Sequence, residues 1–136
     1  MADYHVTFIS WNVNGLGGNR FDELKTALDL QNYPHVVCLQ ETHSKNNKVI
    51  QSWVNELPMY NCYFNHGDGN NRGTCILIHK KIPFKLLMEI QDWEEGRYSI
   101  LKGRLFNDLV SIVSVYALQL PILINPGFLK EYSLAI

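Results

Sequence analysis

Hydrophobic and polar positions along the first forty residues predict a strand, a helix and a second strand. Residues 5–11 alternate between the two classes and are rich in β-forming side chains, which predicts a strand. Within residues 20–31 the apolar positions recur at helical spacing, so we expect a helix with one buried face, capped by Asn19. Residues 36–40 have no polar interruption until Gln40, as expected for a strand buried on both faces. The pattern indicates a β-α-β unit.

The next part of the chain predicts one more helix and several strands. Apolar residues at Ile50, Trp53 and Leu57 mark the core face of a helix that ends before Pro58. Short strands are expected at residues 61–64, 74–79 and 84–90.

Two runs of equal length near the end of this pattern predict a hairpin. Residues 98–106 and 109–117 flank Asn107-Asp108, which is typical of an antiparallel pair joined by a tight turn. The first half of the chain is therefore β-α-β-α and the second half mostly hairpin strands. This order predicts an α/β (α+β) fold with a mixed sheet that has flanking helices on one side.

Composition changes this picture little. The chain has 136 residues, of which 46% are hydrophobic and 18% charged, which suits one globular domain. The net charge of −1 gives no overall basic field that would by itself indicate nucleic acid. Cys38, Cys62 and Cys75 form no C-x-x-C motif, and the first residues lack the features of a signal peptide. Three reduced thiols in an intracellular protein, nuclear or cytoplasmic, are favoured over a disulfide or a metal site.

Residues 109–129 contain no charged side chain, a length that could cross a bilayer. The stretch includes serines, Gln119, Asn125 and two prolines, and its first half fits the hairpin. A buried strand followed by an irregular tail is favoured over a membrane span.

The candidate chemistry lies where the two early strands end. In β-α-β units, ligands bind at the carboxyl ends of the strands, where this sequence has Asn12 and Glu41. Carboxylate and amide oxygens suit a hard cation such as Mg²⁺, which often keeps one or two carboxylates and takes its other ligands from water and phosphate. His43 fits either a phosphate contact or a solvated loop histidine, and Tyr116 either a phosphate contact or a half-buried strand aromatic.

Several short motifs in this order resemble the endonuclease/exonuclease/phosphatase family, and in particular the apurinic-type endonuclease domain of LINE-type non-LTR retrotransposons. The motifs with this resemblance are Ile9-Ser10-Trp11-Asn12-Val13-Asn14-Gly15-Leu16, Leu39-Gln40-Glu41-Thr42-His43, Arg72-Gly73-Thr74-Cys75-Ile76-Leu77-Ile78, Glu95-Gly96-Arg97-Tyr98 and Val113-Ser114-Val115-Tyr116-Ala117. The resemblance implies two packed sheets with outer helices, of which this chain would form the N-terminal half of a four-layer α/β/β/α sandwich.

The resemblance also implies an activity and roles for single residues. It implies Mg²⁺-dependent cleavage of a phosphodiester in DNA, with Mn²⁺ as a possible substitute and no small-molecule cofactor. Glu41 would be the metal ligand, and Asn12 would help to hold the metal and the bound phosphate. Asn14 and His43 would lie beside the substrate, and Tyr116 would reach the phosphate from the end of its strand.

The resemblance stops after Ala117. The later Gly-Asp-x-Asn and Ser-Asp-His motifs of the family do not follow. Gly67-Asp68-Gly69-Asn70 has the first of these patterns but precedes the strand at 74–79, and turn formation explains it. We therefore expect residues 1–117 to be a partial family domain and residues 118–136 an unrelated apolar tail. The interpretation is a truncated DNA endonuclease whose activity is lost or severely reduced.

Truncation carries a structural expectation. If the absent half supplies the second sheet, the sheet from residues 5–117 keeps one apolar face uncovered, which predicts self-association. Two other functions compete with a weakened endonuclease: a non-catalytic fragment that binds nucleic acid or a partner, and a membrane-associated remnant that uses residues 109–129.

Overall fold

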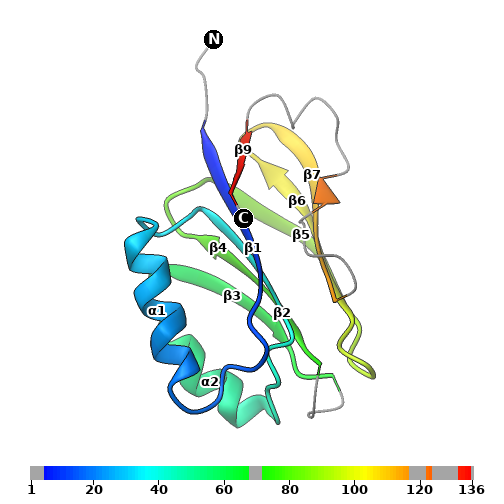
Figure 1. Cartoon of the computed structure of the whole chain (residues 1–136). Helices are drawn as coiled ribbons and strands as arrows, with labels where there is room; N and C mark the ends of the chain where they lie inside the picture. The colour runs from blue at the N-terminus through cyan, green and yellow to red at the C-terminus, as the bar shows by residue number, and fades with distance from the viewer. Residues whose placement is uncertain (1–4, 68–71, 117–121, 124–131, 136) are drawn as a thin grey trace.

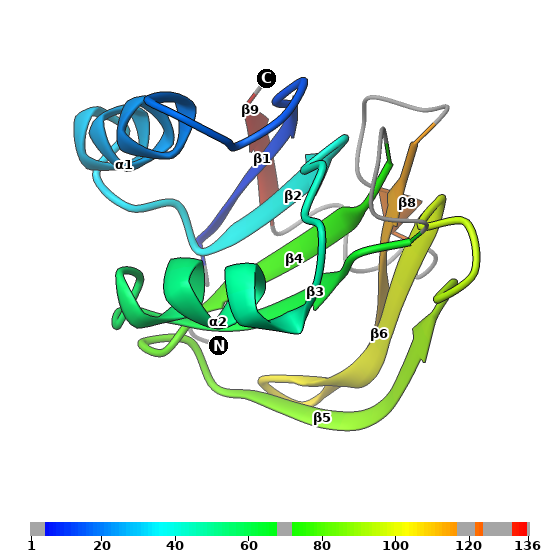
Figure 2. The ribbon, with the colours of Figure 1, turned by 90° about the horizontal axis from the view of Figure 1, so that it is seen from below.

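Two β-sheets pack face to face, and helices cover the other side of one of them (Figures 1 and 2). The computed structural model describes residues 5–67, 72–116, 122–123 and 132–135. The first sheet has the strand order β3-β4-β2-β1-β9 and is mixed, because β1 is parallel to β2 and β9 whereas β4 is antiparallel to β2 and β3. The strands of this sheet are β1 (Val6–Asn12), β2 (Val36–Gln40), β3 (Tyr60–Asn65), β4 (Thr74–His79) and β9 (Tyr132–Ala135).

The helices α1 (Arg20–Leu30) and α2 (Asn47–Asn55) lie on one face of the first sheet. Their apolar residues and every second residue of the strands form one core cluster, in which Phe21 of α1 stacks on Trp53 of α2 with ring centroids 5.8 Å apart. β2 and β4 are buried along their whole length because the helices cover one of their faces and the second sheet covers the other. This double burial explains their uninterrupted apolar sequences.

The second sheet is antiparallel, with strand order β5-β6-β7-β8. Its strands are β5 (Phe84–Gln91), β6 (Tyr98–Leu105), β7 (Asp108–Val115) and β8 (Ile122–Leu123). Leu101, Leu105 and Ile112 point toward the first sheet and pack against its Phe8 and Ile76. The expectation that the first sheet keeps an uncovered face is therefore wrong. The hairpin strands fold over that face as a second sheet, because their alternating apolar positions need a partner surface of their own.

Two local details also differ from the sequence pattern. The N-cap of α1 is Asn19, but its side chain makes no capping hydrogen bond because its backbone is already in the helical region. The β6–β7 turn consists of Phe106 and Asn107, since Leu105 pairs with Asp108, and it lies one residue before the expected Asn107-Asp108. Phe106 takes the left-handed backbone conformation with φ = 55°.

Two short pieces of the expected irregular tail belong to the sheets. Ile122–Leu123 pairs antiparallel with β7, and Tyr132–Ala135 pairs parallel with Val6–Ile9 of β1. Both pieces extend an open sheet edge whose backbone groups would otherwise lack strand partners. No helix in the described part of the chain is long and apolar enough to cross a membrane.

Candidate active site

The candidate residues lie on unusual backbone at one end of the sandwich. Asn14, Glu41 and His43 all have left-handed conformations, with φ of 48°, 56° and 56°. Residues other than glycine rarely adopt these angles, and where they do, the surrounding structure must hold them. Strained backbone is common at functional sites. Its presence at three predicted site residues therefore supports a functional role for this end of the molecule.

The loop after β1 is tied directly to the segment after β2. Gly15 N–H donates to the Glu41 carbonyl at 2.6 Å, and Leu16 N–H donates to the Thr42 carbonyl at 3.0 Å. Gly15 has φ = 91°, and a Cβ atom at this position would lie 2.8 Å from Nδ1 of His43. A glycine is therefore required for the two loops to approach so closely.

Asn12 and Glu41 are in direct contact. Nδ2 of Asn12 donates a short hydrogen bond to Oε2 of Glu41, and Oδ1 of Asn12 accepts the Asn14 backbone N–H at 3.1 Å. A flipped amide would face the carboxylate with an oxygen and the N–H with an amino group, so these partners fix its orientation. Asn12 thus holds one carboxylate oxygen of Glu41 and keeps a lone pair of its own oxygen free.

His43 lies on the other side of the Glu41 carboxylate. Nε2 of His43 is 3.8 Å from Oε1 of Glu41, too far for a hydrogen bond, and this nitrogen is buried without a partner among the described residues. Both side chains are about one-fifth to one-quarter exposed, at 20% for Glu41 and 24% for His43. The imidazole and the carboxylate therefore face each other without a hydrogen bond between them.

Tyr116 joins the site through the backbone only. A chain of hydrogen bonds crosses this end of the sandwich, from Thr42 N–H to the Gly73 carbonyl (3.1 Å), from Gly73 N–H to the Gly96 carbonyl (3.1 Å), and from Tyr116 N–H to the Arg97 carbonyl (2.7 Å). In the described part of the chain no hydrogen bond connects the Tyr116 hydroxyl to Asn12 or Glu41. The exposed Tyr116 side chain, at 37%, is therefore free to contact a bound molecule.

A buried polar layer beneath the site was not predicted from the sequence. Nε2 of Gln40 donates to the hydroxyls of Ser10 (3.3 Å) and Ser114 (3.0 Å), and the Ser114 hydroxyl donates to the Leu39 carbonyl (3.1 Å). These residues join β1, β2 and β7, and each occupies an inward position that is apolar elsewhere on its strand. Polar residues at the last inward positions of several strands were a signal available in the sequence.

A second group in the same layer is centred on Asn65. Its Nδ2 lies within 3.0–3.3 Å of oxygen atoms from Thr74, Gln91, Tyr98 and Ser99, which come from both sheets. Both groups lie at the end of the sandwich that carries Asn12 and Glu41. At this end, buried hydrogen bonds position the strands, whereas apolar contacts do so elsewhere between the sheets.

The residues present fit a cation site with one carboxylate. Glu41 offers Oε1, and Asn12 offers the remaining lone pair of its amide oxygen. No group of three or more His, Cys, Asp or Glu side chains in the described segments is placed to hold a metal ion. This donor set suits Mg²⁺, which takes most of its ligands from water and substrate phosphate, and it does not suit a metal that needs a full protein cage.

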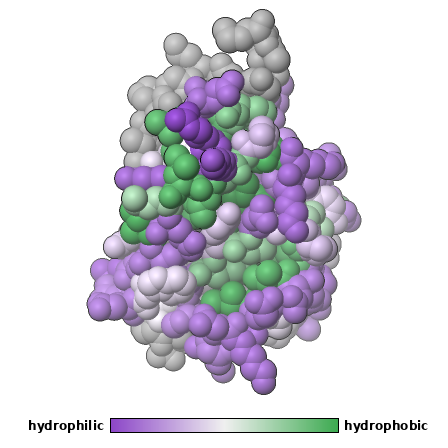
Figure 3. Space-filling model, turned by 180° about the vertical axis from the view of Figure 1, so that it is seen from behind, coloured by the Kyte–Doolittle hydropathy of each residue, from purple (hydrophilic) through white to green (hydrophobic). Residues whose placement is uncertain are grey.

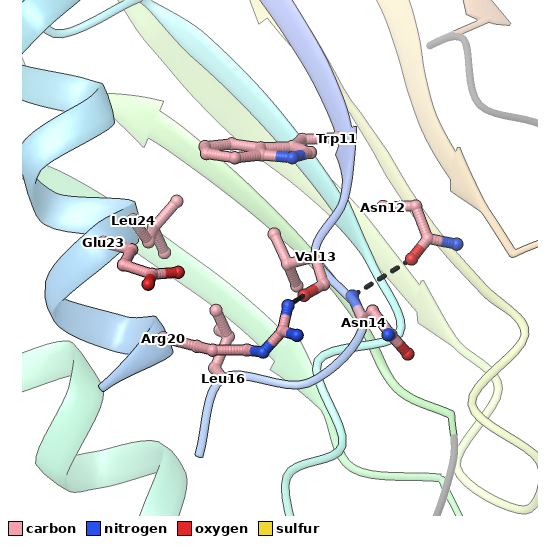
Figure 4. Close-up of a pocket in the computed structure, with 8 residues that line it drawn as sticks. All are labelled: Trp11, Asn12, Val13, Asn14, Leu16, Arg20, Glu23 and Leu24. Carbon is pink, nitrogen blue, oxygen red and sulfur yellow. Dashed lines mark hydrogen bonds between the residues drawn. The ribbon is translucent and has the colours of Figure 1, made fainter. Parts of the chain in front are cut away.

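A shallow pocket lies on the opposite side of β1. In Figure 4, Trp11 and Val13 point toward α1, whereas Asn12 points away from it. Arg20 closes the lower part of the pocket and donates to the Val13 carbonyl at 3.4 Å. The pocket is therefore adjacent to the Asn12–Glu41 pair, and Asn12 lines it, but the Glu41 carboxylate does not.

Comparisons with known proteins agree with this geometry. A sequence model of the Endonuclease/Exonuclease/phosphatase family matches residues 9–128, most of the chain. The match includes the strand ends that carry Asn12, Glu41 and Tyr116. It also extends beyond Ala117, and the domain boundary expected there stays a prediction.

Solved structures share the fold. The APE2 catalytic domain of Xenopus laevis is 17% identical, with a TM-score of 0.58 over 82% of this chain and 44% of that one. TDP2 of D. rerio in complex with a single-stranded DNA product is 21% identical, with a TM-score of 0.54 over 80% and 43%. The 3′ phosphatase NExo from Neisseria, bound to a product DNA hairpin, is 21% identical, with a TM-score of 0.52 over 85% and 41%. The chain spans less than half of each of these structures.

Proposed function

Because the chain belongs to the endonuclease/exonuclease/phosphatase family, we propose that it is part of a Mg²⁺-dependent phosphodiesterase that cleaves DNA. The observation behind this proposal is the contact between Asn12 and Glu41, which places one oriented carboxylate at the carboxyl ends of two parallel strands. The TDP2 and NExo structures are complexes with DNA, which supports DNA as the substrate class. The motifs around Asn12 and Glu41 support a LINE-type retrotransposon enzyme as the specific kind.

Each site residue has a proposed task. Glu41 binds the cation through Oε1, while Asn12 keeps the carboxylate from rotating and adds its amide oxygen as a ligand. When bound, Mg²⁺ supplies charge neutralisation at the phosphoryl oxygens, and Mn²⁺ suits the same oxygen donors. The imidazole of His43, which is 24% exposed, contacts a phosphate oxygen, and Asn14 lies on the same rim. Tyr116 donates its hydroxyl to the phosphate from the end of β7.

We further propose that the 136 residues by themselves cleave DNA weakly or not at all. Glu41 can bind a cation, but in these 136 residues the Gly-Asp-x-Asn and Ser-Asp-His motifs, to which the resemblance assigns activation of the attacking water, do not follow Ala117. Loss of a general base typically lowers the rate by about 10²–10⁴-fold. The alternative function is therefore a non-catalytic fragment that binds nucleic acid weakly or binds a protein partner.

A plasmid-nicking assay with Mg²⁺ at high protein concentration separates the two functions. We expect weak nicking by the wild-type chain that disappears in Glu41→Ala, because the oriented carboxylate is removed. Glu56→Ala is the matched control, since Glu56 caps the C-terminal end of α2 and pairs with Lys25. Equal nicking by the wild-type chain and Glu41→Ala would contradict cleavage at the Glu41 site. No nicking by either would favour the binding fragment over the weakened enzyme.

The outer face of the second sheet is a proposed self-association surface. Met88, Tyr98 and Leu109 point outward there and are 53%, 39% and 56% exposed. Seen from behind, the molecule shows hydrophobic patches with polar side chains around them (Figure 3). We expect concentration-dependent dimers in sedimentation velocity, weakened by Met88→Lys and unchanged by Leu30→Lys on α1. A wild-type monomer throughout the micromolar range would rule this surface out.

A nuclear or cytoplasmic location is proposed from the cysteines. All three are free, and burial raises the pKa of Cys38 to about 12 and that of Cys62 to about 11, so both stay protonated thiols. Free buried thiols suit a reducing compartment. Imaging of the tagged chain in cells tests this, and an extracellular or organelle-lumen signal would contradict it.

A further inference from the structure

Trp93 is an exposed aromatic residue at the end of the sandwich that carries Asn12 and Glu41. It lies in the loop between β5 and β6, and its side chain is 51% exposed. The indole packs against the imidazole of His66, with ring centroids 5.9 Å apart and planes tilted by 50°. His66 is held by a 2.9 Å hydrogen bond between its Nδ1 and the Gly67 carbonyl. An indole supported in this way is arranged to stack on a planar group from solvent.

The loop that carries Trp93 is ordered by its own hydrogen bonds. The Asp92 carboxylate accepts the backbone N–H groups of Glu95 and Arg97, both at 3.2 Å. The Asp92 carbonyl accepts Gly96 N–H at 2.9 Å, and Asp92 N–H donates to the Tyr98 carbonyl at 3.1 Å. Little conformational entropy remains to be lost when a ligand contacts the indole, which favours binding.

This loop is also connected to the candidate active site. The Gly96 carbonyl accepts Gly73 N–H, and the Arg97 carbonyl accepts Tyr116 N–H. The guanidinium groups of Arg72 and Arg97 lie 3.5 Å and 2.8 Å from the Glu95 carboxylate, on the neighbouring part of the loop. Trp93 is therefore held at a fixed position relative to Tyr116 and the strand ends.

The charges around Trp93 indicate which part of a nucleotide it contacts. Asp92, Glu94 and Glu95 surround it in sequence, and such carboxylates repel a phosphate. A nucleobase is neutral and planar, and stacking on an aromatic side chain is tolerant of base identity. The phosphates of the same strand then lie toward the guanidinium of Arg97 and the cation that Glu41 is proposed to bind.

We propose that Trp93 is a nucleobase-stacking subsite for the DNA strand that the Asn12–Glu41 site acts on. The inference rests on the proposed function and adds a binding residue to it. Stacking on Trp93 holds one base while the neighbouring phosphate lies at the metal site. Tyr98 and Tyr116 are also exposed, and backbone hydrogen bonds connect both residues to this loop.

Binding of two matched oligonucleotides to the full chain tests the proposal. The probes are a fluorescein-labelled single-stranded oligo-dT and an abasic oligonucleotide of equal length and charge, both titrated in EDTA. Trp93→Ala should weaken oligo-dT binding by about 5- to 150-fold, the range for loss of a stacked base. Binding of the abasic probe should stay unchanged, and Trp93→Phe should restore most of the oligo-dT affinity.

Leu87→Ala on β5 is the control, because Leu87 is exposed to a similar extent, at 53%, but lies within a strand away from the loop. Unchanged oligo-dT affinity in Trp93→Ala would overturn the stacking role alone. Equal weakening of both probes would also overturn it, since the defect would then lie in the loop and not in base contact. Wild-type protein that binds neither probe would overturn the subsite together with the DNA substrate of the proposed function.

Discussion

Asn65→Ala should lower the free energy of unfolding by about 3–5 kcal/mol. Asn65 is fully buried between the sheets, and its two amide hydrogens are shared among oxygens of Thr74, Gln91, Ser99 and the Tyr98 backbone. The hydroxyls of Thr74 and Ser99 can still bond to each other at 2.6 Å after the substitution. The Tyr98 carbonyl loses its side-chain donor, and a cavity remains where the amide was. Urea unfolding followed by circular dichroism measures the loss.

Two further variants separate the possible causes. Asn61→Ala changes the same residue type on the same strand, but Asn61 is exposed, so its effect should stay within about 0.5 kcal/mol. Asn65→Asp keeps the volume while replacing the donor with a charged acceptor, and it should destabilise at least as much as Asn65→Ala. If Asn65→Asp proved harmless, cavity formation and not hydrogen bonding would explain the alanine result.

Several strands of the fold could be predicted from the sequence. The runs at β2 and β4 were predicted at their observed bounds because strands buried on both faces need continuous apolar residues. The β6–β7 hairpin was predicted, but its turn was placed one residue late. The pairing around the expected turn and the pairing around the observed turn place the same side chains on the inward face. The alternation of apolar and polar residues therefore could not distinguish the two turns.

The pattern of hydrophobic and polar residues could not assign the strands to the two sheets. An alternating strand has one apolar face in either sheet, and the sequence does not state which surface that face meets. The hairpin strands were therefore joined to a single sheet, whereas they form the layer that covers it. The polar layer was missed for the same reason, since Ser99 and Ser114 look like outward residues until the facing sheet is known.

The candidate site could be predicted in part. Asn12 and Glu41 were expected together because parallel strands of a β-α-β unit end at the same edge, and the structure brings the two side chains into contact. The left-handed backbone of Glu41 could not be anticipated, because glutamate rarely adopts it, and His43 has the same conformation with a φ of 56°. It arises from the tertiary hydrogen bonds between the loops. The metal and phosphate roles of these residues stay predictions.

Gly96→Ala should destabilise the protein by about 3 kcal/mol or more and disrupt the site with it. Gly96 has φ = 66°, and a Cβ atom there would lie 2.7 Å from the Gly67 Cα and 2.9 Å from the Gly73 nitrogen. Both obstacles are backbone atoms, so no side-chain rotation relieves the clash. The 72–73 segment must move, and its carbonyl groups hold the backbone N–H groups of Thr42 and His43. Urea unfolding and oligo-dT binding should therefore both show losses.

Glycines in the loop after β1 supply the matched controls for this prediction. Gly18 has a similar φ of 61°, but a Cβ atom there would meet nothing within 4 Å, so Gly18→Ala isolates the backbone strain, about 1–2 kcal/mol. Gly17 has neither a positive φ nor a near neighbour, and Gly17→Ala should be neutral or slightly stabilising. The excess of Gly96→Ala over Gly18→Ala then measures the steric contact between the loops. A zero excess would mean that the backbone at residues 67, 73 and 96 can move apart without cost. The backbone hydrogen bonds from Thr42 to Tyr116 would then not determine the geometry of the site.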